Sequence, residues 1–464
     1  MKRNEINKSG HRISIHDING STSCQGGLVE KLPVEVIGEI LSCVGVARDV
    51  IRASLTCRKW REAYLKHLRT LSFNVADDDR VYRELPISDL EMLITETLYQ
   101  SPGLRRLSIL MDDKHDFMAA TVVGWLMFAR KNLTELFYKV RTSNPINVLA
   151  TFGRQRLETF SLSDYIIDGA EPKFKPFPCL TSLSLTRVRI SVEGLNRLLL
   201  AFPKLERAEL SDIFLWALSD DDHSPEITVK LSCPTLKTLS LSYLQPMDLI
   251  LENGGIEYLH VQRCCFGSFK VNGSKNLRHF NMSYTKVQVH KIEDGDNLES
   301  LEIISSDVTE SNLFPMKINP PQLKTFRIWG TNIFVRGKGL VVDLQQLSVC
   351  SPQLSHLAIF YYEEPSYDFT FGSLEKVGVL EVGWEWDYID GFFEWAEKVL
   401  KCCPNVGKLI VHGIVPKEAL VPCPSKYLED FGAYTSSMLE TMRKYQHIQV
   451  QFVYKYQGEF SAYL

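Results

Sequence analysis

The chain has 464 residues, of which 45% are apolar and 23% charged, with a formal net charge of −4 and a sequence pI of about 6.3. This composition is typical of a globular protein with ample chain for a large core. The slightly acidic balance argues against a general nucleic-acid-binding surface, and no run of about 18 apolar residues predicts a membrane span.

The cysteines give no sign of a disulfide framework or a metal site. Eleven are scattered along the chain, and none form a CxxC pair. This usage favours reduced thiols, so we expect a location in the nucleus or the cytoplasm, or both. No structural zinc site is predicted, because paired ligands at short spacing are missing. We expect no metal and no other cofactor.

The first segment, residues 1–27, is polar and rich in Gly, Ser and Asn. It lacks the apolar region of a signal peptide. We expect a disordered tail here.

The segment 28–72 predicts a unit of three short helices. Leu32-Pro33 places a proline where the first helix can begin, and Gly45 ends that helix. Asp49 is expected to cap the second helix. A unit this small has a thin core, so we expect some of its apolar side chains to contact another protein. The first helix carries apolar residues at helical spacing: Val36, Ile37, Ile40, Leu41 and Val44.

From residue 104 onward the pattern apolar-x-x-apolar-x-apolar returns thirteen times. The first and last copies lie 302 residues apart over twelve intervals, or about 25 residues per repeat. That spacing falls in the range of roughly 20–29 residues found in leucine-rich repeats. A similar pattern at Leu68 precedes the array. The copies begin at Leu104, Leu133, Leu157, Leu180, Leu205, Leu236, Ile256, Leu277, Leu298, Leu323, Leu354, Val377 and Val406.

The spacing within each copy predicts a short strand with one buried face, because the last two apolar residues alternate with a polar one. Stacked copies would form one parallel sheet over a continuous core. Residues 191–205 have the spacing of a helix on the convex side. The shorter intervals between Leu236 and Leu298 leave room only for loops or short strands. We therefore predict an α/β solenoid, a horseshoe with a parallel concave sheet.

The end of the chain differs from the repeats. Residues 426–445 predict a helix, and residues 447–454 alternate as a strand. A last strand would cover the core of the final repeat, as a solenoid requires. The repeat domain with its C-terminal cap is expected over residues 73–455.

The three-helix unit resembles an F-box, whose pattern begins with Leu-Pro, continues with an Ile-Leu pair and closes on Cys-x-x-Trp. One departure is Gly45-Val46-Ala47-Arg48, where the family has Leu-Pro-x-Lys. Followed by the repeats, the chain resembles the plant F-box/LRR-repeat proteins. The matching residues are Leu32-Pro33, Ile40-Leu41 and Thr56-Cys57-Arg58-Lys59-Trp60.

This resemblance implies a substrate-recognition subunit of an SCF-type (Skp–cullin–F-box) ubiquitin ligase. The F-box would bind a Skp-family adaptor and through it a cullin, and the repeats would hold a target protein. Such a receptor is not an enzyme, in keeping with a sequence that lacks phosphate-binding glycine loops and HExxH or G-x-S-x-G motifs. Two alternatives stay open: a leucine-rich-repeat scaffold outside ubiquitination, and a small-molecule-sensing receptor, which a deep basic pocket would favour.

The expected binding residues fall into two groups, one for the adaptor and one for the target protein. Trp60 is placed in the first group, although its helical phase also fits the internal core of the three-helix unit. The expected adaptor-binding residues are Leu32, Pro33, Val36, Ile40, Leu41 and Trp60.

For the target we expect the C-terminal half of the concave face, where aromatic residues and Arg, which are enriched at binding hot spots, replace Ser and Thr between the buried positions. Tall side chains that fill a tighter curve would produce the same pattern. The expected target-binding residues are Tyr258, His260, His279, Arg327, Trp329, His356 and Phe360.

Overall fold

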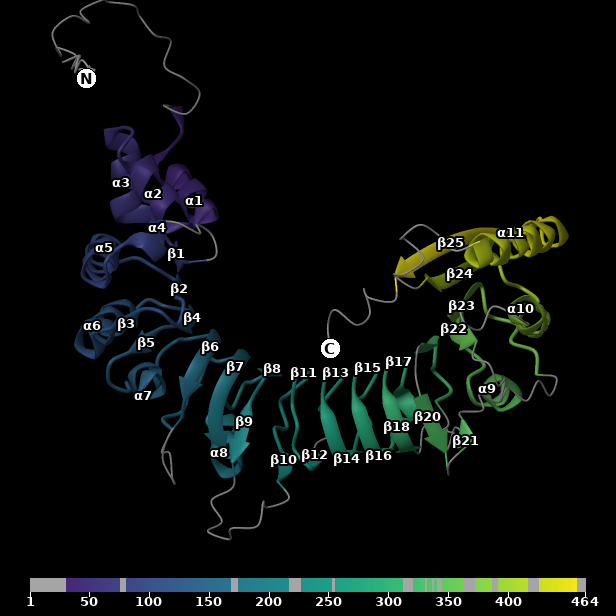
Figure 1. The fold of residues 1–464 in the computed structure, drawn as a ribbon. Helices are drawn as coiled ribbons and strands as arrows, with labels where there is room; N and C mark the ends of the chain where they lie inside the picture. Colours follow the sequence, from purple (N-terminus) through teal and green to yellow (C-terminus); the bar gives the residue numbers. More distant parts are fainter. Residues whose placement is uncertain are drawn as a thin grey trace, which may run out of the picture.

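The computed structural model is an open arc with a small helical unit at its N-terminal end (Figure 1). The expected tail, residues 1–27, lies outside the part of the chain that it describes. The described residues are 31–75, 81–167, 174–216, 227–252, 255–311, 320–329, 332–335, 338–339, 344–361, 372–385, 391–415 and 425–456.

The N-terminal unit consists of three helices, as predicted: α1 (Val34–Val44), α2 (Ala47–Ser54) and α3 (Arg58–His67). Helix α1 starts directly after Pro33, and Gly45 ends it with φ of 65°, a conformation that favours glycine. The expected cap at Asp49 is wrong. Helix α2 begins two residues earlier, at Ala47, and the Asp49 carboxylate instead accepts a hydrogen bond from Arg48 Nε at 3.1 Å.

A parallel sheet lines the inner side of the arc (Figure 1). All thirteen predicted copies lead into one of its strands, and the first apolar residue of each copy is buried. The pattern at Leu68 likewise leads into β1, which therefore spans the boundary expected at residue 72. The strands in spatial order are β1 (Thr70–Asn74), β2 (Arg106–Leu110), β4 (Glu135–Lys139), β6 (Thr159–Ile166), β7 (Ser182–Ser191), β8 (Arg207–Ser211), β11 (Thr238–Ser242), β13 (Tyr258–Gln262), β15 (His279–Ser283), β17 (Ser300–Ile304), β19 (Thr325–Trp329), β22 (His356–Tyr361), β23 (Val379–Glu385), β24 (Lys408–Val415) and β25 (Gln449–Tyr456), with β9 (Phe214–Trp216) paired to β7.

Helices cover the outer side of the sheet at both ends of the arc (Figure 1). The predicted convex helix within residues 191–205 is α8, which Ser191 caps by accepting a hydrogen bond from the Gly194 N–H at 3.0 Å. These helices are α5 (Ile87–Gln100), α6 (Ala119–Ala129), α7 (Val148–Phe152), α8 (Val192–Leu200), α9 (Leu344–Cys350) and α10 (Phe392–Cys402); α4 (Val81–Glu84) precedes α5, and β3 (Asp116–Phe117) pairs with β5 (Arg141–Thr142).

In the middle of the arc a second parallel sheet replaces the helices, as the short intervals between Leu236 and Leu298 predicted. The two sheets pack their apolar residues against each other, for example Phe269 against Phe280 with ring centroids 6.3 Å apart. The strands of this second sheet are β10 (Thr228–Leu231), β12 (Asp248–Glu252), β14 (Cys265–Asn272), β16 (Lys286–Ile292), β18 (Asp307–Ser311), β20 (Asn332–Val335) and β21 (Lys338–Gly339). Only the pairing of β20 with β21 is antiparallel among them.

The C-terminal end closes as predicted with a helix and a strand. Helix α11 (Ser425–Lys444) leads into β25, which pairs in parallel with β24. Tyr434 of α11 packs against Trp384 of β23, with ring centroids 4.8 Å apart and tilted planes. One hydrophobic core therefore extends from the N-terminal helices to this end of the arc.

Candidate functional site

Helix α1 exposes a stripe of large aliphatic side chains at the N-terminal end of the arc. Val36, Ile40 and Val44 are 41%, 38% and 44% exposed and follow one another at i, i+4 spacing. Ile37 and Leu41, which lie next to the stripe around the helix, are fully buried. A helix that stabilises only its own unit would place polar side chains on its outer face. The stripe is therefore a candidate contact surface for another protein.

The other expected adaptor-binding residues lie around this stripe in different environments. Pro33 is exposed, and Leu32 is half-buried against the core. Leu41 does not belong to the surface, because it is fully buried. Trp60 is half-buried and also packs against the core, so it supports the helices from beneath. We had not expected Val44 in the contact surface, although the i, i+4 spacing from Ile40 points to it.

The three-helix unit is fixed rigidly to the first repeats. The Ser72 N–H of β1 donates to the Gly45 carbonyl at 2.7 Å, and Arg69 Nη1 donates to the Gly103 carbonyl at 2.9 Å. Within the unit, α1 and α3 approach so closely that a Cβ on Gly38 would lie 2.3 Å from the Cβ of His67. The two hydrogen bonds therefore attach the helix that carries the stripe to the first strands of the concave sheet.

The middle of the concave face presents exposed aromatic side chains. Tyr258 of β13 is 45% exposed and stacks on His279 of β15, with ring centroids 4.6 Å apart and nearly parallel planes. The parallel register pairs these two residues directly and sets His260 opposite Asn281. Tyr258, His260 and His279 thus form one surface at the centre of the arc, which a bound protein can reach.

At the C-terminal end, an ionic cluster centres on Glu381 of β23. Its Oε1 atom lies 2.8 Å from Arg327 Nη2 and 2.7 Å from His356 Nε2, and its Oε2 atom lies 2.9 Å from His412 Nε2. Burial raises the pKa of Glu381, but the hydrogen bonds from His356 and His412 and the charge of Arg327 outweigh burial and hold this pKa far below its ordinary value. A carboxylate held this way stays ionised and cannot act as a general base at neutral pH.

Trp329 and Phe360 occupy the positions expected on the concave side, but they are not exposed. Their exposed fractions are 5% and 1%, so the expectation that they face outward is wrong. They pack on each other with ring centroids 5.2 Å apart, and His412 meets the Trp329 ring edge-on at 4.2 Å. A Cβ on Gly383 would lie 2.4 Å from the Phe360 ring, so a larger residue at position 383 would displace this ring. The pair forms a small hydrophobic cluster of its own.

A further row of side chains follows the ends of the central strands. Tyr243, Arg263 and Tyr284 come directly after β11, β13 and β15, with φ of 56°, 53° and 52°. The Arg263 guanidinium lies over both tyrosine rings, 5.3 Å and 5.8 Å from their centroids. A positive φ destabilises the backbone of a residue with a Cβ by roughly 1 kcal/mol, so the surrounding structure must offset this strain at all three residues. The apolar repeat pattern missed this row because it ignores the residue after each strand.

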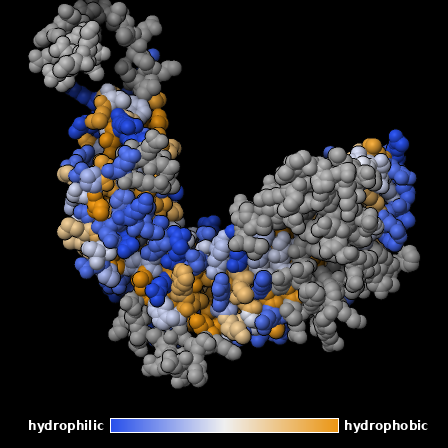
Figure 2. Space-filling model, in the orientation of Figure 1, coloured by the Kyte–Doolittle hydropathy of each residue, from blue (hydrophilic) through white to orange (hydrophobic). Residues whose placement is uncertain are grey.

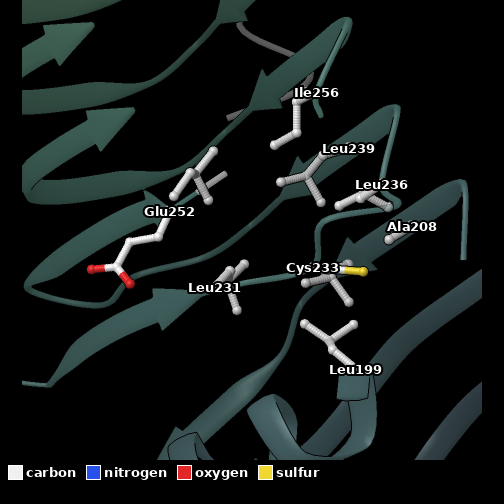
Figure 3. A pocket seen from close by; sticks show the side chains of 10 residues that line it. Leu199, Ala208, Leu231, Cys233, Leu236, Leu239, Glu252 and Ile256 are labelled. Carbon is white, nitrogen blue, oxygen red and sulfur yellow. The ribbon is translucent and has the colours of Figure 1, made fainter. Parts of the chain in front are cut away.

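The apolar pocket in Figure 3 lies where the helix-backed repeats give way to the second sheet. Leu199 of α8, Leu231 of β10 and Leu239 of β11 line it, together with Cys233. The carboxylate of Glu252 points away from these aliphatic side chains (Figure 3). The pocket is therefore a packing seam, and its lining lacks the basic side chains that a sensor of anionic small molecules would require.

The part of the chain that the structure describes shows neither a metal-binding group of side chains nor a membrane-spanning helix. Within it, no three His, Cys, Asp or Glu side chains are grouped so that they could hold a metal ion. Over the same residues, no helix combines the length and the apolar character needed to cross a membrane.

Comparison with known proteins adds three findings. Residues 29–69 match the family model described as F-box-like. The Arabidopsis thaliana F-box/LRR-repeat protein At1g67190 is 40% identical over 438 residues, which cover 92% of this chain and all of that protein. The Arabidopsis thaliana F-box protein At1g10780 is 22% identical over 287 residues, covering 60% of this chain and 63% of the relative.

Among solved structures, the chain resembles one in the crystal structure of the TLR13–ssRNA13 complex. The TM-score is 0.41 at 15% identity, and the match covers 76% of this chain and 55% of the other.

Proposed function

The chain belongs to the plant F-box/LRR-repeat protein family, and from this premise we propose that it is the substrate-recognition subunit of an SCF-type ubiquitin ligase in the nucleus or cytoplasm. In this proposal the N-terminal helices bind a Skp-family adaptor and through it a cullin. The repeats hold the protein to be ubiquitinated. The subunit carries out no chemistry itself.

The exposed stripe of Val36, Ile40 and Val44 is the observation that carries the proposal. Burying a fully exposed side chain of this size contributes about 1.5–3 kcal/mol, and these three are about two-fifths exposed, so together they would contribute roughly 2–4 kcal/mol to the affinity of a complex. The rigid attachment of the helices to β1 supports the same role. A receptor must hold its target at a defined position relative to the rest of the ligase.

For target binding we propose the centre of the concave face, with Tyr258, His260 and His279, extended by Tyr243 and Arg263. Tyr243 and Tyr258 are exposed and Arg263 is half-buried, and Tyr and Arg side chains are enriched at hot spots. Arg327 and His356 lie at the C-terminal border of this surface and remain partly exposed while they hold Glu381. Trp329 and Phe360 support the sheet behind them.

Binding of the full chain to a purified Skp-family adaptor tests the proposal. We expect a stable one-to-one complex, and a cullin added afterwards should join it. If the folded full chain fails to bind any Skp-family adaptor, the proposal is overturned and a scaffold role outside ubiquitination replaces it.

A further inference from the structure

One row of side chains runs along the rim of the concave sheet. Each member has a positive φ and directly follows a strand residue that pairs in register with those of the neighbouring repeats, from Ser163 to Ser283. We call these residues the rim row. In the order of the repeats they are Asp164, Arg187, Asp212, Tyr243, Arg263 and Tyr284.

The two arginines of the rim row have neighbours of opposite kinds. Arg187 lies between two aspartates, and its Nη2 atom donates to the Asp164 carboxylate at 2.8 Å. Arg263 lies between two tyrosines, and its Nη1 atom donates to the Tyr243 hydroxyl. An aspartate cancels the charge of the arginine beside it, whereas a tyrosine ring attracts a guanidinium and leaves its positive charge in place. The row therefore presents a positive charge at Arg263.

The opposite rim of the same sheet follows the arrangement seen at Arg187. The residues just before the strands are alternately acidic and basic, and each backbone N–H from Lys237 onward donates to the carbonyl of the previous member. Lys237 Nζ lies 3.0 Å from Glu206 Oε1, and Lys324 Nζ lies 2.6 Å from Glu299 Oε2. Charges cancel along this rim, so Arg263 departs from the pattern on both sides of the sheet. The members are Glu206, Lys237, Glu257, Arg278, Glu299 and Lys324.

Strand β13 carries an aromatic surface at one end and Arg263 at the other. Tyr258 stacks on His279, and Arg263 follows Tyr258 by five residues, which is about 16 Å along a strand. His260 and Gln262 are polar and half-buried between them. A peptide in extended conformation covers this distance with about five residues.

The strands beside Arg263 carry no charge that would repel an anion. The strands β11, β13 and β15 contain no Asp or Glu. On β17, the carboxylate of Glu302 is held by Asn281 Nδ2 at 3.3 Å and by Arg327 Nη1 at 3.6 Å. Figure 2 shows hydrophilic residues along the inner side of the N-terminal arm as well. A concave face of this polarity selects its partner by charge and hydrogen bonds.

We propose that the surface from Tyr258 to Arg263 binds an extended, acidic segment of the target protein. A carboxylate of this segment pairs with the Arg263 guanidinium, and an apolar or aromatic side chain about five residues away lies on the stack of Tyr258 and His279. The inference rests on the proposed function, because it takes the segment to belong to the protein that the repeats hold.

A carboxylate suits this surface better than a phosphate. The planar guanidinium can donate two parallel hydrogen bonds to one carboxylate. Sites for phosphorylated residues use a cluster of arginines, whereas the rim row has a tyrosine on each side of Arg263. The bound segment is therefore expected to contain Asp or Glu.

Binding of the full chain to an array of random-sequence peptides tests the proposal. Peptides that bind should be enriched in Asp and Glu over the array as a whole, with a large apolar or aromatic residue about five positions from the acid. Raising the salt concentration from about 0.05 M to about 0.5 M should weaken their binding several-fold, because salt screens the ion pair. Bound peptides that are enriched in Lys and Arg, or that show no preference in charge, overturn the proposal.

A pair of matched variants identifies the arginine. Arg263→Gln should lower the affinity of a selected acidic peptide by about tenfold or more, since a hydrogen bond to a charged group is lost. Arg187→Gln makes the same change in the same row and should leave the affinity unchanged, because Asp164 already holds Arg187. Melting curves show that both variants are folded. An unchanged affinity in Arg263→Gln overturns the proposal, as does tighter binding of a peptide in which phosphoserine replaces Glu.

Adaptor binding separates this inference from the proposed function. A chain that binds a Skp-family adaptor but selects no acidic peptides contradicts the acidic segment alone. A chain that selects acidic peptides but binds no adaptor contradicts the ligase role alone and leaves the peptide-binding surface in place.

Discussion

Arg327 and Glu381 are bonded across an intervening strand: Arg327 Nη2 lies 2.8 Å from Glu381 Oε1, although β22 separates β19 from β23. The residue between them is Ala358, which pairs in register with both. Because the Ala358 side chain is only a methyl group, the Arg327 guanidinium can pass over β22 and reach Glu381. The contact joins three successive repeats, so it resists the bending of the solenoid at this point.

The Glu381 cluster should contribute to stability in a pH-dependent way. Its pKa is lowered on folding, so the folded state gains stability above the ordinary value near 4.5 and loses it as the pH falls below that value. Glu381→Gln should lower stability at pH 7 by about 1–3 kcal/mol, because it removes the carboxylate from two histidines and leaves Arg327 only the more distant carboxylate of Glu302. Melting curves between pH 7 and pH 3 check this. Glu302→Gln, whose carboxylate lies 3.6 Å from Arg327, is the control with the smaller expected effect.

His290 predicts a second loss of stability in acid. It packs against both Phe269 and Phe280, with centroid distances of 5.5 Å and 5.3 Å, and burial lowers its pKa to about 3. Below about pH 6.5 His290 therefore binds a proton in the unfolded chain but not in the folded chain. The free energy of unfolding should fall by up to about 1.4 kcal/mol per pH unit from pH 6.5 toward pH 3.

Replacing His290 isolates this contribution. His290→Phe should reduce the fall of the melting temperature between pH 6.5 and pH 4.5, a range in which the Glu381 cluster does not yet lose stability. His260→Phe, on the concave surface, should leave the slope in place because His290 is retained. An unchanged slope in His290→Phe would show that another group causes the loss.

The exposed stripe on α1 should carry the adaptor affinity. Ile40→Glu places a charge at its centre and should weaken binding of a Skp-family adaptor by at least 2 kcal/mol, roughly thirtyfold, without unfolding the chain. Replacing both Leu32 and Pro33 with alanine should weaken it too. Leu200→Glu, at a highly exposed leucine of α8, is the control. Titration calorimetry measures all three, and equal affinity of Ile40→Glu and wild type would count against this surface.

Two aromatic residues of the expected target strip should behave in opposite ways. Trp329→Ala removes a buried ring and should cost about 3–5 kcal/mol of stability. Tyr258→Ala removes an exposed ring and should leave the melting temperature within a few degrees, while it weakens target capture by about 2 kcal/mol or more. Scanning calorimetry separates the two variants. A stable Trp329→Ala protein would restore Trp329 to the binding surface.

The repeats should unfold together. Each packs mainly against its neighbours, so a chain ending after Pro246 would expose β11 and the adjoining core without a cap. We expect this fragment to aggregate, whereas a chain ending after Tyr456 should remain soluble. Size-exclusion chromatography checks both. A soluble 1–246 fragment that melts cooperatively would contradict a single unit.

Much of this fold could be predicted from local sequence patterns. Burying one face of a strand requires alternation, and stacking requires a regular period, so the copies from Leu104 to Val406 predicted their strands individually. The short central intervals predicted the loss of helices by length alone. The helical spacing of Val36, Ile37, Ile40, Leu41 and Val44 predicted the apolar side of α1, but it did not separate the buried Ile37 and Leu41 from the three exposed residues.

Other features depended on contacts between distant repeats. The pattern placed Trp329 and Phe360 between buried positions, but contacts with other parts of the chain, among them His412 and Gly383, decided that they are buried. Glu381 is the centre of an ionic cluster because the strand register brings Arg327, His356 and His412 within hydrogen-bond distance. A local sequence pattern does not show that the Arg327 side chain passes over Ala358 to reach Glu381. Periodicity depends on residues that are close in the sequence, whereas the burial and the pKa of a side chain depend on residues that are close only in the folded structure.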